Sequence, residues 1–154
     1  MSDVFVGLGS NIGNRKQYLR DAINYIDAHS QNNIIKISKF RETEAVTSDK
    51  QAAYINAVIL VETQQDIMSF FEQLCQIEKL LGRVEKGTIQ PRTIDLDILF
   101  FGRQIICEES LIIPHPLLHE REFVLSPLND IAPQFSHPIF QETVEALYRR
   151  VVTS

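Results

Sequence analysis

The sequence predicts an α+β protein in which two helices cover an antiparallel sheet. The first observation is the order of the patterns along the chain, which is strand, helix, strand, strand, helix, strand, and then a hairpin and a helical tail. The second observation is that both helical patterns are apolar on one side only, as expected of helices on one face of a sheet. Together they indicate the ferredoxin-like βαββαβ arrangement, with an added hairpin and a C-terminal helical tail.

The first strand–helix–strand unit occupies residues 4–43. Val4–Leu8 is a short apolar strand, and Ile34–Thr43 is predicted as the second strand. Between them, GLGSNIGN has the spacing G-x-G-x-x-x-G, which differs from the dinucleotide-binding pattern G-x-G-x-x-G. We interpret this segment as a tight turn that needs glycine, with Asn14 as the helix cap. The helix has apolar residues at Leu19, Ala22, Ile23 and Ile26.

The second unit begins after a long polar segment, Glu44–Ala53, which is predicted as a loop. Tyr54–Val61 is apolar on both faces, as in a central strand, except at Asn56. A buried amide can form a structural hydrogen bond, which the sequence alone favours, or can bind a heterocycle. Asp66 is expected to cap the next helix and Gly82 to end it. Its apolar face consists of Ile67, Phe70, Phe71, Leu74, Ile77 and Leu81.

A pair of carboxylates marks the last strand of the core, within Pro91–Gly102. Strict alternation places Asp95 and Asp97 on one face, about 6.6 Å apart at roughly 3.3 Å per residue. That face would also carry Leu99 and Phe101, so we expect water to be scarce there, and Ile94, Leu96, Ile98 and Phe100 would form the other face. The pair either binds magnesium together with substrate phosphates or faces solvent on an edge strand. Arg92 and the basic segment before it favour metal and phosphate.

After this strand, Gln104–Cys107 is predicted to be a short hairpin strand, and Leu111–Ile113 leads into the segment PHPLLHEREFVLSPL. His115 and His119 have a spacing that could suggest zinc. Pro116, however, suits the first position of a helix, so His115 would precede the helix and zinc is disfavoured. His115 and Arg121 are expected either to contact anionic oxygens or to cap a loop. Phe123–Leu128 is a short apolar segment, and a terminal helix is marked by Val144, Leu147 and Val151.

Composition limits the classes of function. The chain has 154 residues, 44% of them hydrophobic and 23% charged, which suits one globular domain. A net charge of -5 argues against a general nucleic-acid binder. No apolar run is long enough to span a membrane, and the start of the chain has no basic lead of a secretory signal. Two isolated cysteines fit a reduced, cytoplasmic protein.

Five segments together resemble the 6-hydroxymethyl-7,8-dihydropterin pyrophosphokinase family: GLGSNIG, YINAV, IEKLLGR, PRTIDLDILFFG and PHPLLHEREFVLSPL. They occur in the family's order over nearly the whole chain. The resemblance implies a single pyrophosphokinase domain over residues 1–154. It also implies transfer of the pyrophosphoryl group of ATP to the pterin hydroxymethyl oxygen, with release of AMP, in folate biosynthesis. The expected partners are ATP and the pterin, without nucleic acid or membrane, and the expected state is a monomer.

The resemblance also implies roles for individual residues. Asp95 and Asp97 would hold two Mg²⁺ ions and, with Arg83 and Arg92, would form the catalytic group. The residues expected to bind ATP are Glu78, Arg83, Arg92, Ile98, His115 and Arg121. The residues expected to bind the pterin are Thr43, Val46, Tyr54, Asn56 and Phe123.

The basic loop Gly82–Pro91 is predicted to be a lid that closes over ATP. It departs from the family pattern at Glu85, Ile89 and Gln90, so we expect closure to be only modestly favoured. Ile112 stands where some members have threonine near the nucleotide.

Two other classes of function stay open from the residues. A metal-dependent nucleotidyltransferase would also use strand carboxylates, but would release pyrophosphate. A non-catalytic ferredoxin-like binding module would not need Asp95.

Overall fold

Antiparallel strands form a central sheet in the computed structural model, which describes residues 1–43, 53–82 and 93–153. Within these residues four strands pair in the order β2–β4–β1–β5. A short fifth strand, β3, pairs with the beginning of β4. The strands are β1 (Ser2–Ser10), β2 (Asn32–Ile37), β3 (Arg41–Thr43), β4 (Tyr54–Thr63) and β5 (Asp95–Phe101). Strand order and element order confirm the predicted α+β fold.

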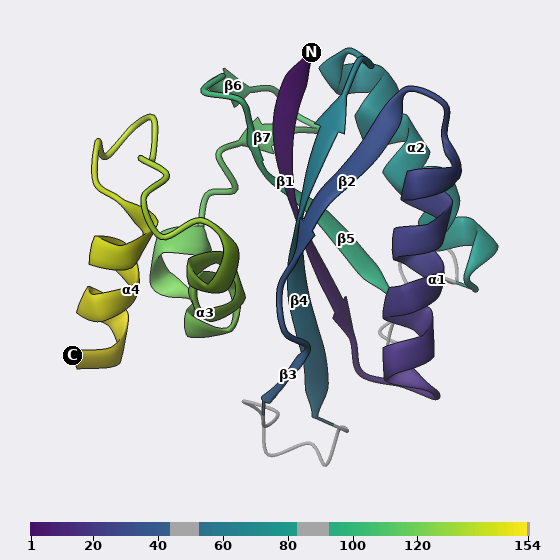
Figure 1. Ribbon diagram of the computed structural model, residues 1–154, viewed down its shortest axis with the longest axis horizontal. Coiled ribbons are helices and arrows are strands. Elements are labelled where there is room, and N and C mark those ends of the chain that lie inside the picture. The colour runs from purple at the N-terminus through teal and green to yellow at the C-terminus, as the bar shows by residue number, and fades with distance from the viewer. Residues whose placement is uncertain (44–52, 83–92, 154) are drawn as a thin grey trace.

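Helices cover both faces of the sheet (Figure 1). On one face lie α1 (Arg15–Ala28) and α2 (Ile67–Leu80), and on the other lie α3 (Glu122–Ile131) and α4 (Val144–Thr153). The predicted hairpin joins β6 (Ile106–Cys107) to β7 (Ile112–Ile113), and a single 3-10 turn, Leu118–Glu120, precedes α3. Residues 123–128 were predicted only as a short apolar segment, whereas they form most of α3.

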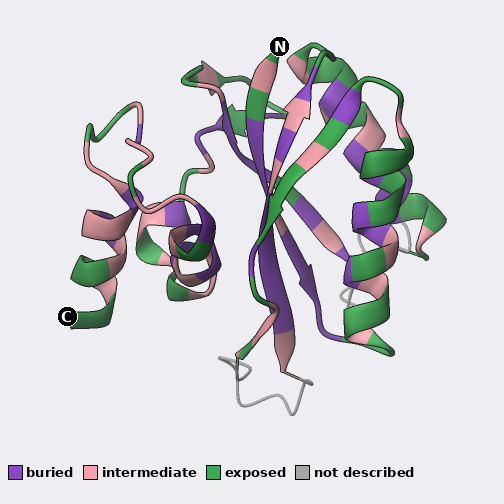
Figure 2. Cartoon of the chain, viewed as in Figure 1, coloured by how far each residue is buried: buried purple, intermediate pink, exposed green. Residues whose placement is uncertain are grey.

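Two apolar clusters hold these layers together, and the middle of the sheet is buried between them (Figure 2). The cluster under α1 and α2 includes Leu19, Ile26, Phe70, Leu74, Leu96 and Ile98. The cluster under α3 and α4 includes Phe5, Leu99, Phe100, Leu125, Leu128 and Leu147. Full burial of one such side chain stabilises the fold by about 1.5–3 kcal/mol.

The predicted helix boundaries in the core are confirmed by their hydrogen bonds. The side chain of Asn14 accepts from the N–H of Gln17 at the start of α1, at 3.3 Å. The side chain of Asp66 accepts from the N–H of Ser69 at the start of α2, at 2.8 Å. Gly82 follows α2 with φ of +95°, a conformation that glycine adopts without strain.

The expected alternation of β5 fails at its end. Val6 pairs with Ile98 but Phe5 pairs with Phe100, so Leu99 is an extra residue in the strand. Such a bulge reverses the faces of the residues beyond it. Phe100 therefore packs under α3 and α4, and Phe101 packs under α1 and α2, the opposite of the prediction.

The predicted strand Ile34–Thr43 is divided into β2 and β3. Its pairing with β4 shifts between Ile34 and Lys36. At Ser38 the hydroxyl oxygen accepts from the N–H of Val58 at 2.9 Å, while the N–H of Ser38 donates to the Val58 carbonyl. The side chain thus replaces a backbone partner, and the chain turns before β3 begins.

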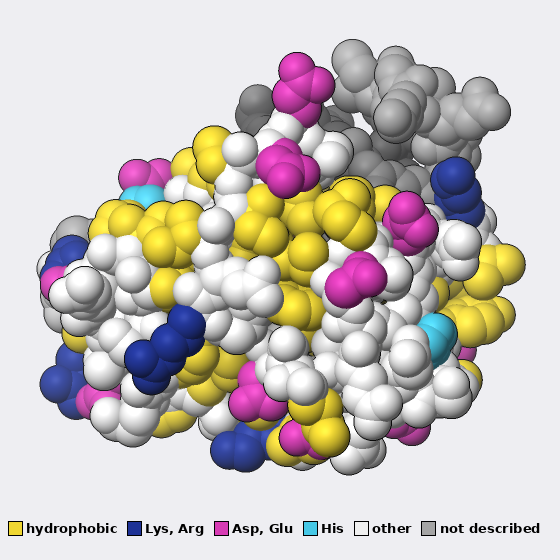
Figure 3. All heavy atoms as spheres, turned by 90° about the horizontal axis from the view of Figure 1, so that it is seen from above, with side chains coloured by type: hydrophobic (Ala, Val, Ile, Leu, Met, Phe, Trp, Pro, Cys, Tyr) yellow, Lys and Arg dark blue, Asp and Glu magenta, His cyan; other side chains and the backbone are white. Residues whose placement is uncertain are grey.

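The end of the sheet that carries the N-terminus exposes hydrophobic side chains beside Asp and Glu side chains (Figure 3). The start of β4, the last residues of β1 and the start of β5 lie at the opposite end. Among the described residues, no helix is both long enough and apolar enough to cross a membrane.

Candidate functional site

At this opposite end, a glycine of β1 lies between one polar side chain on β4 and one on β5. Gly9 pairs with Asn56 on β4 and with Asp95 on β5. Residues directly opposite one another in an antiparallel pair point to the same face. At a strand spacing of about 4.8 Å, the Asn56 and Asp95 backbones lie about 9.6 Å apart. We call Asn56, Gly9 and Asp95 the cross-strand row; its centre has no side chain.

The glycines of β1 are strand residues and not turn residues. A Cβ atom on Gly9 would lie 2.8 Å from Oδ1 of Asn56, and one on Gly7 would lie 3.4 Å from Cδ2 of Leu99. The turn interpretation is therefore wrong for Gly7 and Gly9, although it holds for Gly13, whose φ is +65°. The signal that sequence reasoning missed is their spacing of two, the period of a strand face.

The amide end of the row is held by a side-chain hydrogen bond. Nδ2 of Asn56 donates to Oγ1 of Thr43 at 3.3 Å, and Asn56 is only 8% exposed. Tyr54 pairs with Thr43 across β3 and β4, and its ring would be 3.7 Å from a Cβ on Gly9. Thr43, Tyr54 and Asn56 are thus brought together, as the sequence analysis expected of residues that share one ligand.

The carboxylate end of the row is open to solvent. Asp97 pairs with Gly7 and is exposed, and Asp95 is half-buried. The expectation that water is scarce here is wrong for Asp97, which is exposed, although Leu99 and Phe100 on the same face are buried. No cluster of three or more metal-ligating side chains occurs within the described ranges. Two carboxylates on one face nevertheless fit Mg²⁺, which typically takes one or two carboxylates and completes its shell with water and phosphate oxygens.

Glu78 supports the carboxylate strand from behind. Its Oε2 accepts from the backbone N–H of Leu96 at 2.9 Å, and Glu78 is only 6% exposed. Leu96 stands between the two aspartates on the edge strand, so this bond fixes the strand that carries them. Ile98, which was expected near ATP, directs its side chain into the cluster under α1 and α2.

His115 is hydrogen-bonded to β5 through its backbone, and its side chain interacts electrostatically with Asp97. Its backbone N–H donates to the Leu99 carbonyl at 3.1 Å. Burial lowers the pKa of His115; the Asp97 carboxylate raises that pKa, and the Arg121 guanidinium lowers it. Nδ1 accepts from the N–H of Leu117 at 3.3 Å, so a neutral ring carries its proton on Nε2, where it can donate to an anionic oxygen. This bond also matches the expected loop cap.

Arg121 and Phe123 lie next to each other at the beginning of α3. Arg121 is the residue that precedes the helix, and its guanidinium carbon lies 5.5 Å from the centre of the Phe123 ring. Phe123 is half-buried but belongs to neither apolar cluster. An aromatic ring outside the core, next to a cation, offers a face for stacking of a flat ligand.

Three of the predicted site residues lie outside the described residues, namely Val46, Arg83 and Arg92. The same is true of Glu85, Ile89 and Gln90, and therefore of the predicted lid.

Comparison with known proteins identifies relatives over most of the chain. The family model described as 7,8-dihydro-6-hydroxymethylpterin-pyrophosphokinase (HPPK) matches residues 5–133. The 2-amino-4-hydroxy-6-hydroxymethyldihydropteridine pyrophosphokinase of Bacillus subtilis is 42% identical over 130 residues, which are 84% of this chain and 78% of the relative. The folic acid synthesis protein fol1 of Pneumocystis carinii is 41% identical over 149 residues, 97% of this chain.

Some of these relatives are much longer proteins. The matched region is only 20% of the Pneumocystis protein. The crystal structure of Plasmodium falciparum HPPK-DHPS with pteroate has a TM-score of 0.80 and 16% sequence identity. It covers 99% of this chain and 42% of that chain. At this identity the structural likeness supports the fold alone.

Proposed function

The chain belongs to the 7,8-dihydro-6-hydroxymethylpterin-pyrophosphokinase family, and we propose that it carries out the family's reaction across the cross-strand row. In that reaction, the pyrophosphoryl group of ATP is transferred to the hydroxymethyl oxygen of 6-hydroxymethyl-7,8-dihydropterin, and AMP is released. The reaction belongs to folate biosynthesis. We assign it to residues 1–154 acting as one pyrophosphokinase domain.

The observation that carries this assignment is the position of Gly9. It separates an amide suited to a heterocycle from a carboxylate suited to metal-bound phosphate. The reaction joins these two chemical classes, so its substrates must lie end to end. A side chain at the centre of the row would occupy the place where they meet.

The pterin is assigned to the Asn56 end. The Asn56 amide is held by Thr43, and Tyr54 borders the same space. Phe123 supplies an aromatic face from α3. A flat heterocycle with several donors and acceptors suits a buried amide and an aromatic ring. Val46 joins this group by the resemblance alone.

ATP is assigned to the Asp95 end. Asp95 and Asp97 would hold Mg²⁺, two ions by the family resemblance, and the bound metal would neutralise phosphate charge and orient the transferred group. His115, neutral at physiological pH because burial lowers its pKa, is positioned to donate from Nε2 to a phosphate oxygen. Arg121 adds a fixed positive charge beside it. Arg83 and Arg92 are assigned to the phosphates by the resemblance, as is Ile98 to the nucleotide.

The described residues act by positioning and electrostatics. Transfer of a phosphoryl-type group needs no covalent intermediate with the protein, because the substrate hydroxyl is the nucleophile. Asn56 and Phe123 would orient the pterin so that its hydroxymethyl group points along the row. Glu78 keeps Asp95 and Asp97 in place through the Leu96 N–H. Productive alignment of two reactants can supply a large share of the rate.

The deciding experiment identifies the nucleotide that is released from ATP. The purified protein is incubated with ATP, MgCl₂ and 6-hydroxymethyl-7,8-dihydropterin, and nucleotides are separated by chromatography. We expect AMP and the pterin pyrophosphate in equal amounts, and no AMP when the pterin is left out. Release of pyrophosphate with a nucleotidyl-pterin would instead indicate a nucleotidyltransferase. Binding of the pterin without any AMP would indicate a non-catalytic binding module.

We propose the cellular compartment of the protein from the absence of a disulfide between its two cysteines. Neither Cys75 nor Cys107 forms a disulfide, and Cys107 is exposed. Free exposed thiols persist in a reducing compartment. We therefore place the reaction in the cytoplasm, where ATP is also available.

A further inference from the structure

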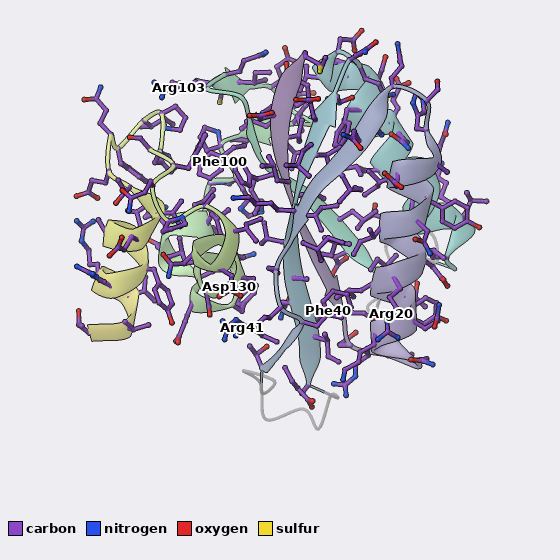
Figure 4. The ribbon with its side chains drawn as sticks, viewed as in Figure 1. Arg20, Phe40, Arg41, Phe100, Arg103 and Asp130 are labelled. Carbon is purple, nitrogen blue, oxygen red and sulfur yellow. The ribbon has the colours of Figure 1, made fainter. Side chains whose placement is uncertain are left out.

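Arg41 forms a two-point contact with Asp130 between β3 and α3 (Figure 4). Nε of Arg41 donates to Oδ2 of Asp130 at 3.2 Å, and a terminal guanidinium nitrogen donates to Oδ1 at 2.6 Å. Two parallel hydrogen bonds fix the orientation of both groups, which a single contact does not. Neither residue was expected from the sequence to have a role in the site.

The Arg41 end of this contact belongs to the amide end of the site. Arg41 pairs directly with Asn56, so the cross-strand row continues through Asn56 to Arg41 on the same face. Thr43, two residues later on β3, accepts the hydrogen bond from the Asn56 amide. β3 has only three residues, and within the described residues it pairs only with β4. Such a short strand needs contacts beyond its ladder to stay in place.

Asp130 belongs to the same helix as Phe123. Asp130 is near the end of α3, and Phe123 is near its beginning, seven residues earlier. A helix is stiff over this length, about 10 Å at 1.5 Å per residue. Fixing Asp130 therefore constrains the direction of α3 and the position of Phe123. Nζ of Lys36 supports the same end, because it donates to the Ile131 carbonyl at 3.3 Å.

We propose that the ion pair of Arg41 and Asp130 is a positioning device for the pterin, setting the separation between the Asn56 amide and the Phe123 ring. The proposal rests on the proposed function, because it assumes that the pterin lies between these two groups. Arg41 and Asp130 would act through Asn56, Thr43 and Phe123 without touching the substrate. Both side chains are partly exposed, at 39% and 21%, and exposed ion pairs add little to stability. We therefore assign this contact a role in positioning β3 and α3 relative to each other, and not a role in stability.

The test compares substrate affinities in charge-removing variants. Arg41→Gln, Asp130→Asn and the double variant are assayed by AMP formation, with each substrate varied in turn. We expect the KM for the pterin to rise roughly threefold to tenfold in each single variant, while the KM for ATP changes less than about twofold. The double variant should be no worse than either single variant, because one contact is lost in all three.

A matched control is the ion pair between Glu142 and Arg150, which joins α4 to the segment before it at 2.5 Å. Glu142→Gln removes a comparable exposed contact and should leave both KM values unchanged. Thermal unfolding of every variant is measured in parallel. A charge swap, Arg41→Asp with Asp130→Arg, should recover part of the pterin affinity.

The outcomes separate the proposal from the proposed function. An inactive wild-type protein would refute the proposed function. An active wild-type protein whose Arg41→Gln and Asp130→Asn variants keep the normal KM for the pterin would overturn the positioning role alone. Equal increases in both KM values, together with a lower melting temperature, would also overturn it, because they indicate a purely structural contact. Additive losses in the double variant would show that the two residues do not act as a pair.

Discussion

Gly9 and Asn56 face each other across β1 and β4 so closely that a Cβ atom on Gly9 would lie 2.8 Å from Oδ1 of Asn56. Real Cβ atoms do not approach an oxygen to this distance, so any side chain at position 9 must displace the amide. The amide is itself tied to Thr43 at 3.3 Å. Glycine at position 9 is therefore needed to keep the Asn56 amide in its place.

The first prediction concerns this contact. Gly9→Ala should force the Asn56 side chain out of position and weaken pterin binding roughly 5-fold to 150-fold, because overpacking typically costs about 1–3 kcal/mol and about 1.4 kcal/mol is a factor of ten. Titration calorimetry with the pterin measures the loss. Gly7→Ala is the matched control, because the nearest atom to its methyl group would be Cδ2 of Leu99, at an ordinary contact distance of 3.4 Å. Equal effects of the two substitutions would contradict the argument.

The second prediction concerns the amide itself. Asn56→Ala should weaken binding of the pterin by about 1–3 kcal/mol, the typical penalty for a buried polar partner left unpaired. Binding of a non-hydrolysable ATP analogue should change far less, because the nucleotide is assigned to the other end of the row. Calorimetry with each ligand separates the two effects. Asn33→Ala, at an exposed position of β2, is the control. The assignment fails if both ligands weaken equally.

The third prediction concerns the carboxylates. Asp97→Asn should leave the fold intact, because Asp97 is exposed and lies outside both clusters. It should lower turnover at least about a hundredfold, because a neutral amide compensates the charge of a metal ion poorly. Activity is measured over a range of magnesium concentrations, and circular dichroism checks the fold. Asp21→Asn on α1 is the control. Near-normal turnover at saturating magnesium would refute the metal assignment.

Much of this fold follows from local patterns in the sequence. The apolar faces of α1 and α2, their capping residues and the order of the strands are set by periodicity and by single polar residues at helix ends. The carboxylate pair was also predictable, because alternation in a strand holds over the two positions from Asp95 to Asp97.

Other features depend on contacts between distant segments. The bulge at Leu99 arises from its pairing with β1, so no pattern within β5 could reveal that Phe100 and Phe101 exchange faces. The division between β2 and β3 depends on the bond from Val58 to Ser38. The contact of Arg41 with Asp130 joins residues 89 positions apart. Helix α3 contains Pro127, which argues against a helix from the sequence, yet tertiary packing of Leu125 and Leu128 outweighs it.

The last prediction concerns stability in acid and rests on His137, which is 2% exposed. Its Nδ1 accepts from the backbone N–H groups of Ile139 and Phe140, at 3.1 and 3.2 Å. The Phe140 ring stacks on the imidazole with centroids 4.4 Å apart, and the edge of Phe100 meets it at 5.4 Å. Burial, with a smaller contribution from His119, lowers the pKa of His137 to about 4.

This pKa fixes the direction of the pH dependence. The unfolded chain has an ordinary histidine pKa of about 6.5, so between about pH 6.5 and 4 it binds a proton that the folded protein does not. The contribution of His137 to the free energy of unfolding is therefore fully present above pH 6.5, and it is lost as the pH falls toward 4. A shift of this size corresponds to at most about 3 kcal/mol.

The test replaces the titrating ring by an acceptor that does not titrate. His137→Asn can keep an oxygen near the two N–H groups but cannot gain a proton in this range, so urea unfolding should show a flatter dependence on pH between 6.5 and 4. His29→Gln is the matched control, since Nδ1 of His29 also accepts a backbone N–H, from Gln31 at 3.1 Å, at the surface. A wild-type protein whose unfolding free energy is constant over this range would rule out the buried neutral ring. So would a His137→Asn variant with the same slope as the wild-type protein.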